Sequence, residues 1–399
     1  MTKKLYYTDS FLKKFTANIY SHYEENGEYH LRLDRTAFYP EGGGQPADKG
    51  YIGKSRVNYV YEDGGELYHV VDSLPKKKNN LECQIDWERR FDLMQQHTGQ
   101  HLLSAVLEKL YRGQTVGFHL GENRVTIDTD VGLTREALHH IETEVNDIIY
   151  QNKMVQVEYP DSQELDNMDL RKEPDVEGNI RIIKIEGTDI SPCGGTHLKT
   201  TGQIGIISVV ESENYKGGTR ISFLCGRRAL LDYRFKNDIT AEIRDVLSVK
   251  NEDIIPEMTR VREELADKEK KIEYLNDELL DYKINDYRNK AEKIKDYRII
   301  TKILTEENYN NTKIMANKLT DQENNIIIFG QKDSDTARII LAKSENIDKM
   351  NMNKLIKEVM QELDGNGGGH EYFAQGGFSK MEQLPAAVEK AYQRIKNSL

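Results

Sequence analysis

Two motifs that lie far apart in the sequence constrain the fold of this 399-residue chain more than any other feature. His97 and His101 lie in HTGQH, within a stretch of helical periodicity, so both imidazoles are expected on one face of a helix, one turn apart. CGGTH supplies Cys193 and His197, and its two glycines allow a turn to wrap closely around an ion. One thiolate and three imidazoles favour Zn²⁺, so the sequence predicts that both segments meet at one zinc ion per chain.

Hydrophobic periodicity predicts an α+β protein with four parts. Residues 1–90 alternate apolar and polar positions between Gly and Asp-Gly turns, which predicts a small β-barrel or sandwich. Residues 91–235 mix helical and strand patterns and carry both metal motifs, which predicts an α+β zinc-containing domain. Residues 236–296 are charged and helical, and residues 297–399 predict a compact α/β module with a glycine-rich loop between its last two helices.

The charged segment contains one long amphipathic helix that begins near Pro256. Its apolar positions keep a spacing of three or four residues through roughly three heptads, with Lys268 as an interruption. Two interpretations remain open for this helix. It is a coiled-coil-like arm that makes a homodimer together with the C-terminal module, or it packs on its own domain.

Composition excludes several classes of protein. Hydrophobic residues make up 37% and charged residues 31% of the chain, and no apolar run approaches the ~20 residues that span a bilayer, so no membrane partner is expected. The N-terminus lacks the apolar region of a secretory signal, and three cysteines suit a reducing compartment, so we expect a cytoplasmic protein. The net charge of −11 argues against a nucleic-acid partner only for the chain as a whole, because local basic clusters remain.

Four segments carry a resemblance that covers nearly the whole chain. They are RTAFYPEGGGQPADKG at 35–50, HTGQHLL at 97–103, SPCGGTHL at 191–198 and DGNGGGHEYFAQGG at 364–377. In this order they resemble the glycine-rich motif and the two zinc motifs of the alanyl-tRNA synthetase editing domain, and the DHHA1 module shared with DHH phosphoesterases. The chain as a whole resembles the long form of the free-standing editing proteins called AlaX.

The resemblance implies a zinc-dependent hydrolase that deacylates mischarged tRNA(Ala), either Ser-tRNA(Ala) or Gly-tRNA(Ala) or both, with tRNA(Ala) as its partner. The chain starts at the segment that precedes the editing domain, so we expect a free-standing editing protein rather than the synthetase. It also lacks an Asp-His-His triplet, so phosphoesterase activity is not expected.

Residues near the metal motifs are candidates for substrate contact. Thr36 and Gln45 offer a hydroxyl and an amide that can hold the amino acid or a water, although capping of a turn explains them equally well. Related synthetases often carry Thr where this chain has Gln100, so Gln100 bears on the choice between serine and glycine. A glycine run allows close backbone approach to a ligand, or forms an ordinary hairpin turn: Gly42, Gly43 and Gly44.

The glycine-rich segment of the C-terminal module is the candidate for tRNA contact, because exposed backbone N–H groups suit phosphate oxygens. The alternative is a hinge or a tight turn beside a dimer interface. The residues concerned are Gly367, Gly368, Gly369 and His370.

The sequence leaves the role of the zinc open. Four protein ligands are typical of a structural metal, whereas catalytic zinc usually keeps one position open. The ion either takes part in activating water or positions the tRNA end. Two further functions therefore remain as alternatives: a zinc-stabilised tRNA-binding protein without catalysis, and an editing enzyme for another substrate such as Ser-tRNA(Thr).

Overall fold

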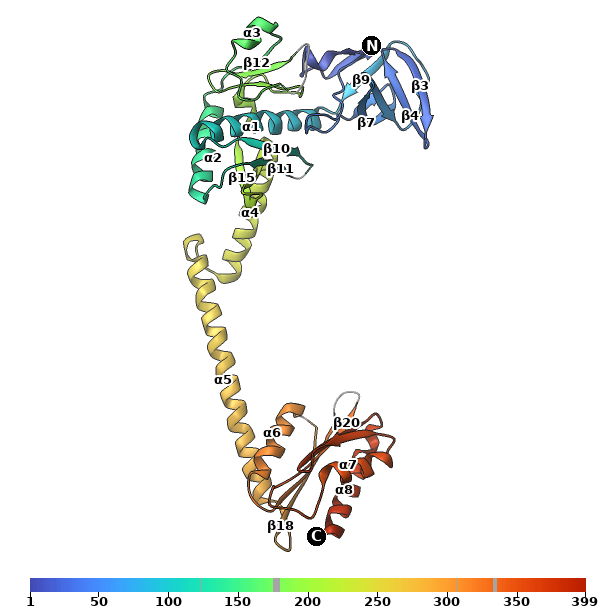
Figure 1. Cartoon of the computed structure of the whole chain (residues 1–399), viewed down its shortest axis with the longest axis vertical. Helices are drawn as coiled ribbons and strands as arrows, with labels where there is room; N and C mark the ends of the chain where they lie inside the picture. Colours follow the sequence, from blue (N-terminus) through green and yellow to red (C-terminus); the bar gives the residue numbers. More distant parts are fainter. Residues whose placement is uncertain (123, 175–179, 306, 333–335) are drawn as a thin grey trace. The chain divides into compact units, whose positions relative to one another are not determined.

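The structure is a computed structural model that forms two compact units, Met1–Val246 and Leu247–Leu399 (Figure 1). Both units combine helices with β-sheets, which confirms the α+β class. The described residues are all those of the chain except 123, 175–179, 306 and 333–335. Within them, no helix is both long and apolar enough to cross a membrane.

The N-terminal part of the first unit is a seven-stranded antiparallel sheet. In spatial order its strands are β2 (Lys14–Ala17), β9 (Leu81–Ile85), β6 (Gly50–Ile52), β7 (Ser55–Asp63), β8 (Glu66–Val71), β4 (Glu28–Leu33) and β3 (Ile19–Glu25). The two edge strands, β2 and β3, are separated in sequence by Asn18 alone, so the sheet curls until its edges meet there. Among the described residues no hydrogen-bonded ladder joins these edges, so a closed barrel stays a prediction.

Helix α1 (Trp87–Tyr111) leaves this sheet and forms the centre of the first unit (Figure 1). The Asp86 side chain caps it by accepting from the backbone N–H of Arg89. Arg90 is fully buried and donates through Nε to Asp48 at 3.0 Å and through Nη2 to the Ala37 carbonyl at 2.6 Å. A buried, multiply hydrogen-bonded ion pair therefore holds the start of α1 against the 35–50 segment.

The rest of α1 is buried almost all around because two sheets and a helix enclose it. One sheet has the order β10 (Thr115–Leu120), β11 (Val125–Thr129), β16 (Gly218–Cys225) and β15 (Ile207–Tyr215). The other has the order β12 (Val155–Glu158), β13 (Ile182–Ile185) and β14 (Asp189–Pro192). Helix α2 (Arg135–Tyr150) packs beside α1 through apolar residues spaced three or four apart, Leu138, Ile141, Val145 and Ile149. HTGQH thus lies in the interior, beside the strand that leads into CGGTH.

The remaining elements of this unit are short or terminal. They are the parallel pair β1 (Lys3–Lys4) and β5 (Arg35–Thr36), helix α3 (Ser162–Asp166), helix α4 (Gly226–Leu247), and two short 3-10 helices at Leu5–Tyr7 and Thr201–Ile204.

The second unit is built on a six-stranded sheet. Its order is β17 (Glu292–Ile294), β18 (Tyr297–Leu304), β19 (Asn325–Lys332), β20 (Ala337–Lys343), β22 (Phe373–Phe378) and β21 (Asn366–Gly369). Only β18 and β19 run parallel, joined across helix α6 (Tyr309–Thr320). Ile326 and Ile328 belong to the core beneath helices α7 (Met352–Gln361) and α8 (Leu384–Ser398), whereas Ile327 and Phe329 belong to the core beneath α6. The alternation buries β19 on both faces.

Helix α5 (Ile254–Asn289) contains the seam seen in the sequence, with Pro256 in its first turn. Seam residues are exposed along most of it, with 57% of Leu265, 59% of Ile272 and 49% of Leu279 accessible. Near its C-terminal end, Leu280 and Ile284 are buried in the core beneath α6. Apart from Ile254 at its start, the buried residues of α5 in the described structure thus lie in its final turns.

The prediction of a glycine-rich loop between the last two helices is wrong, because most of this segment is β-strand. It forms β21 and β22, which pair antiparallel around a turn at His370, whose N–H donates to the Phe373 carbonyl at 2.7 Å. A Cβ at Gly367 would lie 2.9 Å from Met360 Cγ, and one at Gly376 would lie 2.5 Å from Met360 Sδ. The glycines therefore let α7 lie directly against the hairpin, a packing requirement that resembles a loop signal in sequence.

Candidate metal centre

Four side chains from distant parts of the first unit converge as the sequence predicted. His97 and His101 project from α1, and Cys193 and His197 come from the turn that follows β14. Each offers one ligand atom, and these atoms all lie within 4.8 Å of one another. His97 Nε2 lies 3.4 Å and His197 Nε2 3.2 Å from Cys193 Sγ. The three imidazoles are at most 4% exposed, whereas Cys193 is half-buried.

Each imidazole uses its Nδ1 for a hydrogen bond, which leaves Nε2 for a metal. His97 Nδ1 donates to Gln45 Oε1 at 2.9 Å, an oxygen that also accepts from the Thr196 N–H at 3.1 Å. His101 Nδ1 lies 2.7 Å from Asp189 Oδ2, and His197 Nδ1 lies 3.3 Å from Thr98 Oγ1. Outer partners of this kind set the tautomer and ring orientation of metal-binding histidines.

The titration of these groups favours the ligand forms of two of them. Burial would raise the pKa of the Cys193 thiol, but the imidazoles of His97 and His197 hold that pKa well below its usual range. Burial lowers the pKa of His197 to about 3, so its ring is neutral at pH 7. Burial would also lower the pKa of His101, but the hydrogen bond to Asp189 outweighs it and raises that pKa to about 9. A metal bound here would displace the proton from His101, so its affinity would fall as the pH falls.

The donor set fits zinc. One thiolate and three imidazole nitrogens are borderline-soft ligands that Zn²⁺ accepts in tetrahedral geometry, and the outer hydrogen bonds already select the coordinating nitrogens. Gly195 makes the close packing possible, because a Cβ there would lie 2.2 Å from His97 Cε1. Gly99, between the two histidines, faces Cys225, whose Sγ would lie 2.3 Å from an added Cβ.

Two cavities adjoin the cluster and share part of their walls. The smaller, of about 290 Å³, is lined by His97 and His101 together with Gln100 and Phe118. The larger, of about 500 Å³, lies between the glycine-rich turn and the CGGTH turn. Gly43, Lys172, Pro192 and Cys193 contribute to both cavities, so one ligand can extend from one into the other.

The glycine run forms a tight turn at this junction. Gly42 and Gln45 exchange backbone hydrogen bonds of 3.1 and 3.0 Å, and Gly43 and Gly44 between them have φ values of +57° and +81°. Left-handed backbone of this kind favours glycine. A Cβ at Gly44 would also lie 2.8 Å from the ring of Phe118, so the turn sits directly on the wall of the smaller cavity.

The other predicted substrate residues occupy different places. Gln45 is fully buried and is hydrogen-bonded to His97 of the metal cluster and to Thr196 of the CGGTH turn. Gln100 lines the smaller cavity and donates to Ser104 Oγ at 2.8 Å. Thr36 is fully buried, with its hydroxyl 2.8 Å from His69 Nε2, and it is not among the described residues that line either cavity. Contact of these side chains with substrate stays a prediction.

Sequence reasoning missed Asp189 and Arg181. Asp189 is held by Arg171 Nε at 2.7 Å and by Ser191 Oγ at 2.8 Å, in addition to His101. Arg181 donates through Nη1 to the carbonyls of Cys193 at 2.6 Å and Gly195 at 2.9 Å. Asp189 stands four positions before Cys193, and a carboxylate so near a ligand motif was an available signal; Arg181 had none.

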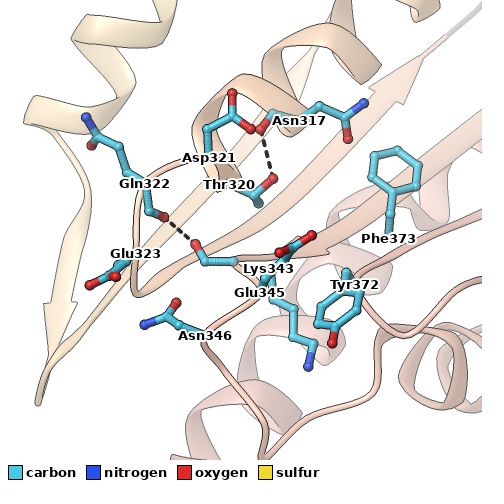
Figure 2. Close-up of a pocket in the computed structure, with 11 residues that line it drawn as sticks. Asn317, Thr320, Asp321, Gln322, Glu323, Lys343, Glu345, Asn346, Tyr372 and Phe373 are labelled. Carbon is cyan, nitrogen blue, oxygen red and sulfur yellow. Dashed lines mark hydrogen bonds between the residues drawn. The ribbon is translucent and has the colours of Figure 1, made fainter.

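A cavity of about 640 Å³ lies in the second unit (Figure 2). Its wall carries Asp321, Glu323 and Glu345 beside Lys343, whose ammonium donates to the Ile347 carbonyl. This wall is net negative and repels phosphates, so we assign it no part in binding nucleic acid. Gly367 and Gly368 instead line a separate cavity of about 500 Å³.

Comparison with known proteins places this geometry in a family. Residues 180–222 match the threonyl and alanyl tRNA synthetase second additional domain, and residues 296–397 match the DHHA1 domain. The chain thus combines a match to this second additional domain with a match to a DHHA1 module.

Relatives that align with nearly the whole of this chain identify its family. The alanyl-tRNA editing protein AlaX-L of Pyrococcus horikoshii is 33% identical over the whole of both chains. Alanine–tRNA ligases of Pyrococcus abyssi and Methanopyrus kandleri are 30% and 29% identical over 97% and 94% of this chain, which spans 43% and 42% of their length. The chain belongs to the family of alanyl-tRNA editing proteins of the AlaX-L type.

Proposed function

We propose that this protein is a trans-editing deacylase that hydrolyses mischarged tRNA(Ala), with Ser-tRNA(Ala) or Gly-tRNA(Ala) as substrate and zinc as its metal. The observation that carries the proposal is the convergence of His97, His101, Cys193 and His197 beside two connected cavities. Membership of the AlaX-L family, whose P. horikoshii member is an alanyl-tRNA editing protein, supports the choice of substrate.

The reaction is hydrolysis of the ester between the amino acid and the terminal ribose. The oxygen of a water bonds to the ester carbonyl carbon, and the bond from that carbon to the ribose oxygen breaks. The ribose oxygen takes one proton and the solvent takes the other, so the products are a free amino acid and a tRNA with its hydroxyl restored. Zinc, when bound, would supply a Lewis acid that polarises the carbonyl and favours ionisation of a nearby water.

The side chains of this protein orient the candidate ligands and shape the cavities that would hold the substrate. Gln45 and Asp189 hold the rings of His97 and His101 at Nδ1, so both rings present Nε2 in a defined direction. The tight turn at Gly43 forms part of both cavity walls, so a substrate meets backbone rather than a side chain there. Gln100 lines the smaller cavity, where the amino acid would lie, and is the polar group suited to read a serine hydroxyl.

The test is release of labelled serine, glycine and alanine from the corresponding charged tRNA(Ala), before and after chelation. We expect chelator-sensitive release of serine or glycine with alanine retained. His97→Ala should abolish zinc binding and release, while His139→Ala, which alters an exposed histidine of α2, should change neither. A zinc-loaded protein that binds tRNA(Ala) but releases none of these amino acids would refute the deacylase and leave a zinc-stabilised tRNA-binding protein.

The tRNA specificity needs its own comparison, because the domain matched at residues 180–222 takes its description from both threonyl and alanyl enzymes. The DHHA1 match and the AlaX-L relative support alanine. Ser-tRNA(Thr) is therefore the competing substrate. Faster release of serine from Ser-tRNA(Thr) than from Ser-tRNA(Ala) would mean that the protein edits threonine tRNA instead.

We propose that the second unit carries the RNA contact and the dimer contact. Backbone N–H groups of Gly367, Gly368 and Gly369 on the edge strand β21, with His370, are suited to bind phosphate oxygens. The exposed seam of α5 supports a homodimer, since a second copy would cover it. Sedimentation of the full chain should give a dimer that Leu265→Glu and Ile272→Glu together convert to monomer; sedimentation of the unaltered chain as a monomer would refute it.

A further inference from the structure

The wall of the larger cavity beside the metal cluster includes a buried arginine side chain with unused hydrogen-bond donors. Arg181 contributes to its wall, and only 7% of the residue is exposed. Its Nη1 donates to the carbonyls of Cys193 and Gly195, which ties the guanidinium to the turn that carries two of the metal-binding residues. Its Nε and Nη2, both buried, have no hydrogen-bond partner within the described part of the chain.

Unused donors on a buried guanidinium are costly unless a ligand accepts from them. Nearly all buried polar groups in proteins are hydrogen-bonded, and an exception of this kind calls for a functional explanation. The N–H groups of Nε and Nη2 lie on one edge of the planar guanidinium, which is the geometry that grips two oxygens of a phosphate or carboxylate. Arg181, which contributes to the wall of the larger cavity, therefore carries a two-pronged anion site.

Both carboxylates among the described residues of the cavity wall have other partners. Glu62 accepts from Lys4 Nζ at 2.8 and 2.9 Å, and Glu41 is engaged with the Tyr59 hydroxyl. The ring of Tyr7 lies 5.5 Å from the Arg181 guanidinium carbon, and Tyr39 donates its hydroxyl to the Gly42 carbonyl at 3.1 Å. The cavity thus combines an anion site with aromatic walls, a combination that suits a nucleotide.

We infer that Arg181 binds the 5′-phosphate of the terminal nucleotide of the substrate, and that the larger cavity holds this nucleotide while the smaller cavity holds the amino acid. The inference rests on the proposed function, because the substrate is an aminoacylated nucleotide. Both cavities meet at Gly43 and Cys193, so the ester that joins the two halves of the substrate lies beside the metal cluster. Arg181 lines the larger cavity and is not among the described residues of the smaller one, so the nucleotide is assigned to the larger cavity and the amino acid to the smaller.

Substrate fragments with and without the phosphate test this role directly. The full-length zinc-loaded protein is given 3′-seryl-AMP and 3′-seryl-adenosine, and deacylation rates are measured for the unaltered chain and for Arg181→Gln. Arg124→Gln is the matched control, because Arg124 is an exposed arginine of the same unit, paired with Glu211. Zinc content of each variant shows whether the CGGTH turn keeps its shape.

We expect Arg181→Gln to lower kcat/KM for 3′-seryl-AMP by about 10- to 100-fold, as for loss of a charged hydrogen bond, and to change 3′-seryl-adenosine little. The unaltered protein should prefer the phosphorylated fragment by a similar factor, and Arg124→Gln should retain that preference. Equal losses on both fragments, with reduced zinc, would mean that Arg181 only supports the turn and would overturn the inference. No loss on either fragment would overturn it as well.

A binding measurement separates this inference from the deacylase itself. Amide analogues, in which nitrogen replaces the ribose 3′-oxygen, bind without being hydrolysed, and calorimetry compares the analogue with and without its 5′-phosphate. Tighter binding of the phosphorylated analogue, lost in Arg181→Gln, supports the contact even if the protein hydrolyses neither fragment. Affinities that do not depend on the phosphate would refute the contact while leaving the deacylase untouched.

Discussion

Replacement of Gly195 by alanine should release the metal, although the adjacent Gly194 should tolerate the same change. A Cβ at Gly195 would lie 2.2 Å from His97 Cε1, 2.5 Å from His97 Nδ1 and 2.9 Å from Gln45 Oε1. Ordinary contact begins at 3.4 Å, so the imidazole must retreat by about 1.2 Å. Zn–N bonds tolerate about 0.2 Å, so a retreat of this size removes His97 from the coordination shell.

The expected loss is at least about 100-fold in zinc affinity, or about 2.7 kcal/mol, since even outer-shell changes at zinc sites cost 10- to 100-fold. Affinity is measured by competition with a chromophoric chelator, and thermal unfolding with and without zinc shows how much of the stability the metal supplies. A Cβ at Gly194 meets only the Tyr7 hydroxyl at 3.6 Å, and neither glycine has a positive φ, so Gly194→Ala is a control of matched chemistry. Equal affinities of the two variants would refute the argument that the His97 ring needs the space at Gly195.

Three further changes test neighbouring parts of the site and the core. Asp189→Asn removes the carboxylate that lies 2.7 Å from His101 Nδ1, and we expect about 10-fold weaker zinc binding in the same competition assay. Gly99→Ala places a Cβ 2.3 Å from Cys225 Sγ and should cost about 1–3 kcal/mol in urea unfolding, most of it recovered when Cys225→Ala removes the sulfur; a failed recovery would locate the strain elsewhere. Burial lowers the pKa of His69 to about 4 from 6.5, so between these values the unfolded chain binds a proton that the folded chain does not. Stability should therefore fall by up to about 3 kcal/mol as the pH drops from 6.5 to 4, and His69→Gln should flatten that part of the profile relative to the unaltered chain.

The four candidate metal ligands and their meeting point could be predicted because residue type and spacing, which decide ligand chemistry, can be read directly from the sequence. A histidine pair one helical turn apart needs only the helix, and the helix is clear from its apolar spacing. The Nδ1 partners could not be assigned in this way. Gln45 and Asp189 are 52 and 88 residues from the histidines they hold, and only the packed fold shows which polar side chain reaches which ring.

Glycines misled sequence reasoning in the second unit because they have two opposite uses. Gly43 and Gly44 do form a turn, where positive φ values require them. Gly367 and Gly376 instead lie in paired strands, where the missing Cβ makes room for Met360. A sequence records the absence of a side chain in both cases, and only the neighbouring helix distinguishes close packing from backbone freedom.

The charges around the metal cluster are better suited to a site that binds substrate than to a purely structural metal site. Arg171 pairs with the Asp189 carboxylate, and Arg181 donates to the carbonyl of Cys193, so the two guanidinium charges balance that carboxylate and the Cys193 thiolate when the imidazoles are neutral. A divalent ion would then leave the site with surplus positive charge in a chain whose net charge is −11. A structural metal gains nothing from that surplus, whereas a phosphate and a developing oxyanion are both stabilised by it. Removal of zinc should therefore weaken binding of the phosphorylated amide analogue more than that of its phosphate-free counterpart, and equal weakening would show that the surplus charge does not reach the nucleotide.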